Sequence, residues 1–74
     1  MSKLYSSRAI VKILERYGFV FVSQKGSHIK LRKFTSIKTL TAIVPANRKE
    51  VSFGTYKSIL LQSELSEEEF SKKK

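Results

Sequence analysis

The sequence predicts a single small α+β domain with a two-layer α-β-β-β-α architecture. A helical pattern of apolar residues comes first, three short strand-like segments follow it, and a second helical pattern comes after them. The chain has 74 residues, which is the size of one domain. We therefore expect two helices to pack on one face of a three-stranded antiparallel sheet, whose other face meets solvent.

The first helix is predicted over residues 6–17. Ser6 or Ser7 can cap its start, and Gly18 stands where a helix commonly ends in a left-handed residue. Four apolar residues share one helix face by their i, i+3, i+4, i+7 spacing: Ile10, Ile13, Leu14 and Tyr17.

Three strands are predicted, at residues 19–22, 28–34 and 39–44. The first is a run of aromatic and β-branched residues, which is typical of a buried strand. Turns are expected at 24–27 and 35–37, and Pro45 ends the third strand. In the second strand the alternation assigns two groups to opposite faces: Ile29 and Leu31 to one, and His28, Lys30 and Arg32 to the other.

A polar and basic loop over 46–53 is expected to lead into a second helix that opens at Gly54 and Thr55, with Thr55 as the cap. Its apolar face is formed by Tyr56, Ile59 and Leu60. After it, Ser66 and Glu69 have the spacing of a capping box.

Leu65 and Phe70 flank that capping box as a hydrophobic staple, so a short helical turn is predicted to begin near Glu67. The ordered part of the domain, which spans 1–74, is expected to run from about residue 6 to residue 70, with 71–74 frayed.

The aromatic residues are mainly assigned to the core. Tyr17, Phe19, Phe21 and Phe70 are predicted to be buried. The pattern does not decide whether Tyr5, Phe34 and Phe53 are buried or exposed. Tyr56 is expected either to pack in the core or to contact a partner.

Positive charge is concentrated in the body of the chain. Fifteen Lys and Arg stand against six acidic residues, all Glu, which gives a net charge of +9. Residues 1–63 hold twelve of the basic residues and only two Glu, a net charge of +10. Such a charge on a small domain indicates a polyanionic partner, most commonly nucleic acid. The alternatives are a general solubility charge or a ribosomal-type protein held in RNA.

The residues that are missing exclude several classes of chemistry. The sequence has no Cys, so disulfides, thiolate metal sites and Cys nucleophiles are excluded. It has no Asp and no clustered carboxylates in the body, which disfavours a metal-dependent nuclease, and its three glycines form no P-loop. We expect no metal and no cofactor.

There is neither a long apolar run nor a signal-peptide pattern, so a cytoplasmic protein with no membrane contact is expected.

His28 is the one histidine of the chain. Histidine is the side chain best suited to exchange protons near neutral pH, and cleavage of RNA needs proton transfers and positive charge at the phosphorus centre. Lys25 in the preceding turn adds to the same surface, while Lys30 and Arg32 are interpreted as phosphate contacts. The spacing alone equally fits a surface histidine that stacks on a base or has no function.

Several short motifs follow one another along the chain: Gly18-Phe19, Gln24-Lys25-Gly26-Ser27-His28, Val44-Pro45, Gly54-Thr55, Ile59-Leu60 and Leu65-Ser66-Glu67-Glu68-Glu69-Phe70. In their order and spacing the sequence resembles the HicA family of mRNA interferase toxins, from about residue 6 to residue 70. The resemblance implies a fold like that of the double-stranded-RNA-binding domain and a toxin that cleaves RNA without the ribosome. It also implies that His28 is essential for catalysis and that the Lys25-Gly26-Ser27 turn contacts RNA.

The same resemblance implies a HicB antitoxin that covers the toxin and usually carries a DNA-binding domain that represses the operon. Because the positive face must be covered to silence a toxic enzyme, we expect this antitoxin to lie over the His28 face, and the toxin to reach DNA only through it. Many family members carry a second histidine after the proline of the third strand, but here the stretch after Pro45 reads Ala46-Asn47-Arg48. A scheme with two histidines is therefore excluded, and Lys25, Lys30 or water must share the proton transfers. A non-catalytic RNA-binding module of the same fold is the main alternative; a DNA-binding repressor is disfavoured, because no recognition helix follows a short helix-turn.

Overall fold

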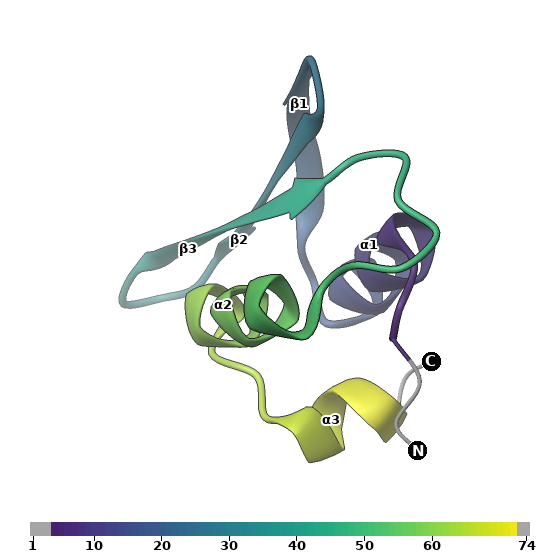
Figure 1. The fold of residues 1–74 in the computed structure, drawn as a ribbon. Helices are drawn as coiled ribbons and strands as arrows, with labels where there is room; N and C mark the ends of the chain where they lie inside the picture. Colours follow the sequence, from purple (N-terminus) through teal and green to yellow (C-terminus); the bar gives the residue numbers. More distant parts are fainter. Residues whose placement is uncertain (1–3, 73–74) are drawn as a thin grey trace.

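The computed structural model describes residues 4–72 and has the predicted order of elements, with a short third helix at the end (Figure 1). The elements are α1 (Ser7–Arg16), β1 (Val20–Lys25), β2 (His28–Phe34), β3 (Thr39–Pro45), α2 (Phe53–Ser63) and α3 (Glu67–Lys72). The three strands form one antiparallel sheet in the order β1-β2-β3, so the predicted α+β class is confirmed. Positions 73–74 of the predicted frayed end lie outside the described residues.

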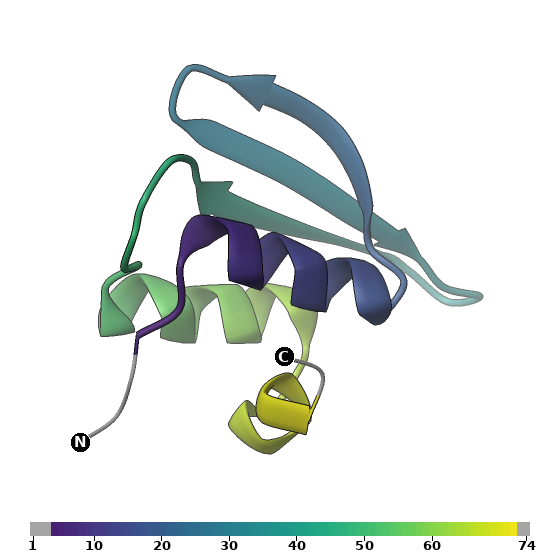
Figure 2. The same ribbon diagram turned by 90° about the vertical axis from the view of Figure 1, so that its right-hand side faces the viewer.

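Both long helices lie on the same side of the sheet, and α3 lies on the side of these helices that is away from the sheet (Figures 1 and 2). The core is closed between these layers by apolar side chains from every helix and from two strands. Its largest fully buried members are Ile10, Ile13, Leu14, Leu31, Val44, Val51, Ile59 and Phe70.

The local signals for α1 act as predicted. The Ser6 hydroxyl accepts a hydrogen bond from the Ala9 N–H at 3.1 Å, so Ser6 is the cap and Ser7 is the first helical residue. After Tyr17 the chain leaves the helix through Gly18, whose φ of 99° is accessible to glycine at little cost.

The prediction that the first strand is buried is wrong. Phe19 is buried, but Phe21, assigned to the core, is 56% exposed, and all of β1 is exposed. The reason is the position of β1 at the edge of the sheet: the helices pack mainly against β3, and β1 rises away from them (Figure 1). Tyr17 is only partly buried, although it packs against the core and its hydroxyl donates to the Glu69 carbonyl.

The cap of α2 also differs from the prediction. The helix begins at Phe53, and the Ser52 hydroxyl accepts from the Thr55 N–H at 3.4 Å. Thr55 therefore lies in the first turn of the helix and is not its cap. Phe53 and Phe34, whose positions the pattern left open, are both exposed.

The short helix α3 is capped as expected. The Ser66 hydroxyl accepts from the Glu69 N–H at 3.0 Å, and a Glu69 carboxylate oxygen accepts from the Ser66 N–H at 2.9 Å. The pKa of Glu69 is held below its ordinary value by these hydrogen bonds. The bond from the Ser66 N–H has the largest effect, and that with the Ser66 side chain comes next. Phe70 is fully buried and packs α3 against two tyrosines. The centroid of its ring lies 5.3 Å from that of Tyr5 and 5.5 Å from that of Tyr56.

Candidate nucleic-acid interface

The turn between β1 and β2 places His28. Gly26 has a φ of 56°, which lets the chain reverse tightly, and the Gln24 side-chain amide donates to the Gly26 carbonyl at 3.2 Å. His28 is the first residue of β2, and its side chain is exposed. In the sheet it lies between Lys25 of β1 and Pro45 of β3, so the three residues form one row across the strands.

A β-bulge at Val22 puts Lys25 on the same face as His28. Phe21 pairs with Leu31 on the helix side, and strict alternation would return Lys25 to that side four residues later. The register shifts between Phe21 and Ser23, so β1 has one extra residue, and Lys25 pairs with His28 on the open face.

A hollow of about 370 Å³ lies on this open face, and we call it the sheet-face hollow. It is lined by Ser23, Lys25, His28, Lys30 and Ile43. The structure thus brings together His28 and two of the predicted RNA-binding residues, Lys25 and Lys30. The other predicted residues lie outside this hollow. Arg32 is on the same face but farther along β2, opposite Val20 and Thr41, and Gly26 and Ser27 form the turn.

A second hollow, of about 320 Å³, lies between β3 and α2, and we call it the α2 hollow. His28 and Ile43 line this hollow as well as the sheet-face hollow, so His28 stands where the two meet. Its polar lining comes mainly from the helix and the loop before it: Arg48, Ser52, Thr55, Ser58 and Gln62.

The loop after β3 is fixed to α1 by the buried residue Ser7. The Ser7 hydroxyl donates to the Pro45 carbonyl and accepts from the Arg48 N–H at 3.0 Å. The Ala46 N–H donates to the Ser27 carbonyl at 2.7 Å, which ties the same loop to the β1–β2 turn. These bonds hold the backbone of Arg48 beside His28, whereas long loops are otherwise the mobile parts of a domain.

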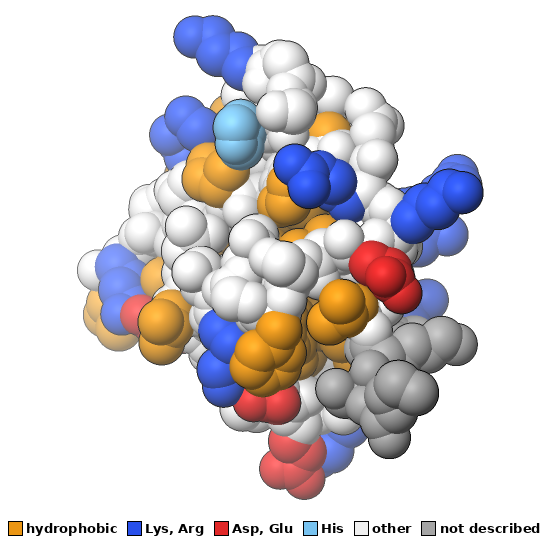
Figure 3. Space-filling model, viewed as in Figure 1, with side chains coloured by type: hydrophobic (Ala, Val, Ile, Leu, Met, Phe, Trp, Pro, Cys, Tyr) orange, Lys and Arg blue, Asp and Glu red, His pale blue; other side chains and the backbone are white. Residues whose placement is uncertain are grey.

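Positive charge on this surface is not neutralised by the protein itself. Within residues 4–72 the ion pairs join Lys38 to Glu64, Lys57 to Glu67 and Lys72 to Glu68, so none involves Lys25, Lys30, Arg32 or Arg48. In Figure 3 the histidine lies in the upper half of the molecule, and the acidic side chains visible in this view lie mainly below it. A positive surface of this kind suits a polyanionic ligand.

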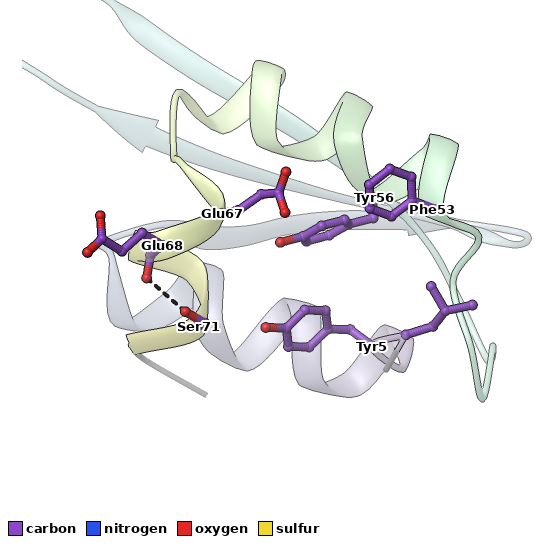
Figure 4. Close-up of a pocket in the computed structure, with 7 residues that line it drawn as sticks. Tyr5, Phe53, Tyr56, Glu67, Glu68 and Ser71 are labelled. Carbon is purple, nitrogen blue, oxygen red and sulfur yellow. Dashed lines mark hydrogen bonds between the residues drawn. The ribbon is translucent and has the colours of Figure 1, made fainter. Parts of the chain in front are cut away.

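A third hollow, of about 340 Å³, has the opposite character (Figure 4). Tyr5, Tyr56 and Phe53 line it together with Glu67 and Glu68 of α3, and both tyrosine hydroxyls point toward α3. Burial, with Tyr5 and Glu67 nearby, raises the pKa of Tyr56 above its usual value. The two carboxylates repel phosphate, so we assign this hollow no part in the candidate nucleic-acid interface.

Two further properties concern residues 4–72 as a whole. No group of three or more His, Cys, Asp or Glu side chains in this range is placed to hold a metal ion. None of the helices there has the length and apolar character needed to span a bilayer.

The sequence reasoning missed the α2 hollow. The sequence pattern predicts only a connecting loop at Arg48. The position of Arg48 beside His28 depends on the hydrogen bonds of Ser7, which the pattern does not reveal. The polar residues of α2 did leave a signal: Thr55, Ser58 and Gln62 are spaced by three and four positions, so they form one stripe beside the apolar face of the helix.

The fold and this surface define a small basic α-β-β-β-α domain whose one histidine is exposed at the end of the sheet, beside lysines that form no ion pair within residues 4–72. A family model described as HicA toxin of bacterial toxin-antitoxin matches residues 7–65 of the chain. The protein therefore belongs to the HicA toxin family, and its role is that of the toxin in a toxin-antitoxin system with an antitoxin partner. A search of curated proteins finds no match to the chain.

Proposed function

We propose that this toxin is an endoribonuclease that cleaves mRNA at His28 without a metal ion and without the ribosome. The observation that carries the proposal is the place of His28: it is exposed, it stands where two hollows meet, and Lys25 and Lys30 flank it. A single-stranded RNA that crosses both hollows would present one phosphate to the imidazole.

The reaction is a transfer of the phosphoryl group within the RNA. The 2′-oxygen attacks the neighbouring phosphorus, and the bond from phosphorus to the 5′-oxygen of the next nucleotide breaks. The products are a 2′,3′-cyclic phosphate and a free 5′-hydroxyl, and the proton lost by the 2′-hydroxyl is balanced by the proton gained by the leaving oxygen.

His28 performs one of these proton transfers, and Lys25, Lys30 or a water molecule performs the other. The ammonium groups also offset the negative charge that develops on the phosphorane. Arg48 is exposed on the loop beside His28 and adds a further positive charge near the reacting centre.

The test compares wild type with His28→Ala and His28→Gln in an assay of RNA integrity on gels. The second variant keeps polarity and size but cannot transfer a proton at neutral pH. Both should remain folded by circular dichroism, because an exposed side chain contributes little packing, and both should bind RNA without cutting it. Unchanged cleavage by a pure, folded variant would overturn the proposal.

The second candidate function is an RNA-binding module without catalysis, favoured by the absence of another histidine in the chain. It requires that wild type and His28→Ala bind RNA equally and that neither cuts it.

The antitoxin partner is proposed to be HicB-like and to cover the His28 face with acidic or polar groups over an interface of at least about 1,200 Å². DNA is then reached only through the antitoxin, and the site of action is the cytoplasm. Charge reversal by Lys30→Glu should weaken both RNA binding and neutralisation by the antitoxin. Tight neutralisation of that variant would place the antitoxin elsewhere.

A further inference from the structure

The two hollows that meet at His28 differ in chemistry. The sheet-face hollow has two lysines, Lys25 and Lys30, which suit phosphate and carry no sequence information. The α2 hollow has one cation, Arg48, and is otherwise polar through neutral hydroxyl and amide groups. Neutral groups that both donate and accept hydrogen bonds suit the edge of a nucleobase better than a phosphate.

The neutral groups of the α2 hollow have hydrogen-bonding capacity left over. The side-chain hydroxyl of Ser58 makes no hydrogen bond with any other of residues 4–72. The Thr55 hydroxyl accepts from Ser52 at 3.0 Å, which leaves its own proton to donate. The side-chain oxygen of Gln62, Oε1, accepts a hydrogen bond from the Ile43 N–H at 2.9 Å. This bond holds the side-chain amide in place and leaves its NH₂ group to donate.

The frame around these groups is fixed. Thr55, Ser58 and Gln62 lie on one helix, and Gln62 is bonded to the backbone of β3. The backbone of Arg48 is held by Ser7, and its planar guanidinium offers a surface on which an unstacked base can lie. A base that enters this hollow meets oriented donors, and it does so beside the side chain that cleaves.

We propose that the α2 hollow is a base-recognition subsite. It takes the base of one of the two nucleotides that flank the cleaved phosphate, while the sheet-face hollow holds the backbone of the other. This inference rests on the proposed ribonuclease function for its position in the reaction. It makes Thr55, Ser58 and Gln62 determinants of the RNA sequence that is cut.

The first experiment sequences the ends produced from a randomised single-stranded RNA by wild type, Thr55→Val and Ser58→Ala. Ser36→Ala is the matched control, because Ser36 is an exposed serine in the turn between β2 and β3, outside both hollows. The two α2 variants should lower the base preference at one flanking position by about fivefold, the value of one hydrogen bond.

Ser36→Ala should leave that preference unchanged, and Lys30→Ala should slow cleavage at all sequences alike. A base preference in Thr55→Val and Ser58→Ala that equals that of wild type, with cleavage intact, overturns the subsite.

The second experiment does not depend on cleavage. Short 2′-O-methyl oligonucleotides of single base composition lack the attacking hydroxyl, and they are titrated into the wild-type toxin while backbone amide signals are followed by NMR. The amides of Thr55, Ser58 and Gln62 should shift by amounts that differ between bases, whereas those of Lys25 and Lys30 should shift alike for all bases.

Equal shifts for all four bases along α2 overturn the subsite. Base-dependent shifts from a protein that does not cut RNA would support the subsite and overturn only the nuclease proposal. The two proposals therefore fail separately.

Discussion

The side-chain hydroxyl of Ser7 accepts a hydrogen bond from the Arg48 N–H at 3.0 Å, and the Ser7 N–H donates to the Arg48 carbonyl at 3.0 Å. The two residues are 41 positions apart in the chain. Through this pair the first turn of a core helix fixes a loop of the candidate site, so the stability of the fold and the geometry of the site depend on one buried side chain.

Replacing Ser7 with Ala should lower the free energy of unfolding by about 1–3 kcal/mol, because the Pro45 carbonyl and the Arg48 N–H then lose a buried partner. Urea unfolding measures the loss, and Ser36→Ala, at an exposed position, should change stability by less than about 0.5 kcal/mol. Equal stability of the two variants would mean that water replaces the hydroxyl.

Cleavage should continue in excess EDTA and should leave a 2′,3′-cyclic phosphate, because the proposed proton transfer at His28 and the proposed charge stabilisation by Lys25 and Lys30 need no metal ion. DNA of the same sequence should stay intact, since it lacks the 2′-hydroxyl. The products are identified by mass spectrometry. Strict dependence on Mg²⁺, or cleavage of DNA, would contradict the mechanism.

The salt dependence of RNA binding should report the residues that contact phosphate. For single strands log affinity falls against log salt with a slope of about −0.7 per phosphate neutralised, so roughly four to six contacts give a slope near −3 to −4. Lys30→Ala should make the slope shallower by about 0.7. Lys57→Ala is the control, because Lys57 pairs with Glu67 on the acidic side of the molecule, and it should leave the slope unchanged. A wild-type slope near zero would mean that RNA binds elsewhere.

The cap of α3 should make stability depend on acid. The pKa of Glu69 is below its ordinary value of 4.5 in the folded protein, mainly because the Ser66 N–H bonds to the carboxylate. The ionised carboxylate therefore stabilises the fold above about pH 4.5, and this contribution is lost as the pH falls through the lowered value. Between pH 7 and pH 3, wild type should lose more unfolding free energy than Glu69→Gln, whose side-chain oxygen still accepts the bond. Parallel pH profiles would show that the carboxylate charge has no part in the cap.

Local signals in the sequence predict much of the fold. The cap of α1, the alternation in β2 and the capping box of α3 each depend on residues within four positions of one another, and each is confirmed. The same reasoning fails where tertiary position decides. Phe21 has the residue type of a core strand, but β1 is at the edge of the sheet, beyond the helices.

The candidate site was predictable only in part. The turn and the alternation of β2 place His28 and Lys30 on one face, and the sequence contains that information. Whether Lys25 joins them depends on the bulge at Val22, which is a property of the pairing of β1 with β2. Whether Arg48 joins them depends on a contact with Ser7, 41 positions away, and the residue pattern reveals neither.

The bulge at Val22 also bears on whether the toxin stays in solution. The outer edge of β1 presents backbone groups that another strand could pair with, and Val20, Phe21 and Val22 are 40–56% exposed there. A flat apolar edge of this kind is a template for aggregation, and an extra residue with local twist makes it a poor one. We therefore expect the single extra residue that brings Lys25 to His28 to disfavour edge-to-edge pairing as well, so a chain without it should both lose Lys25 from the open face and aggregate more readily.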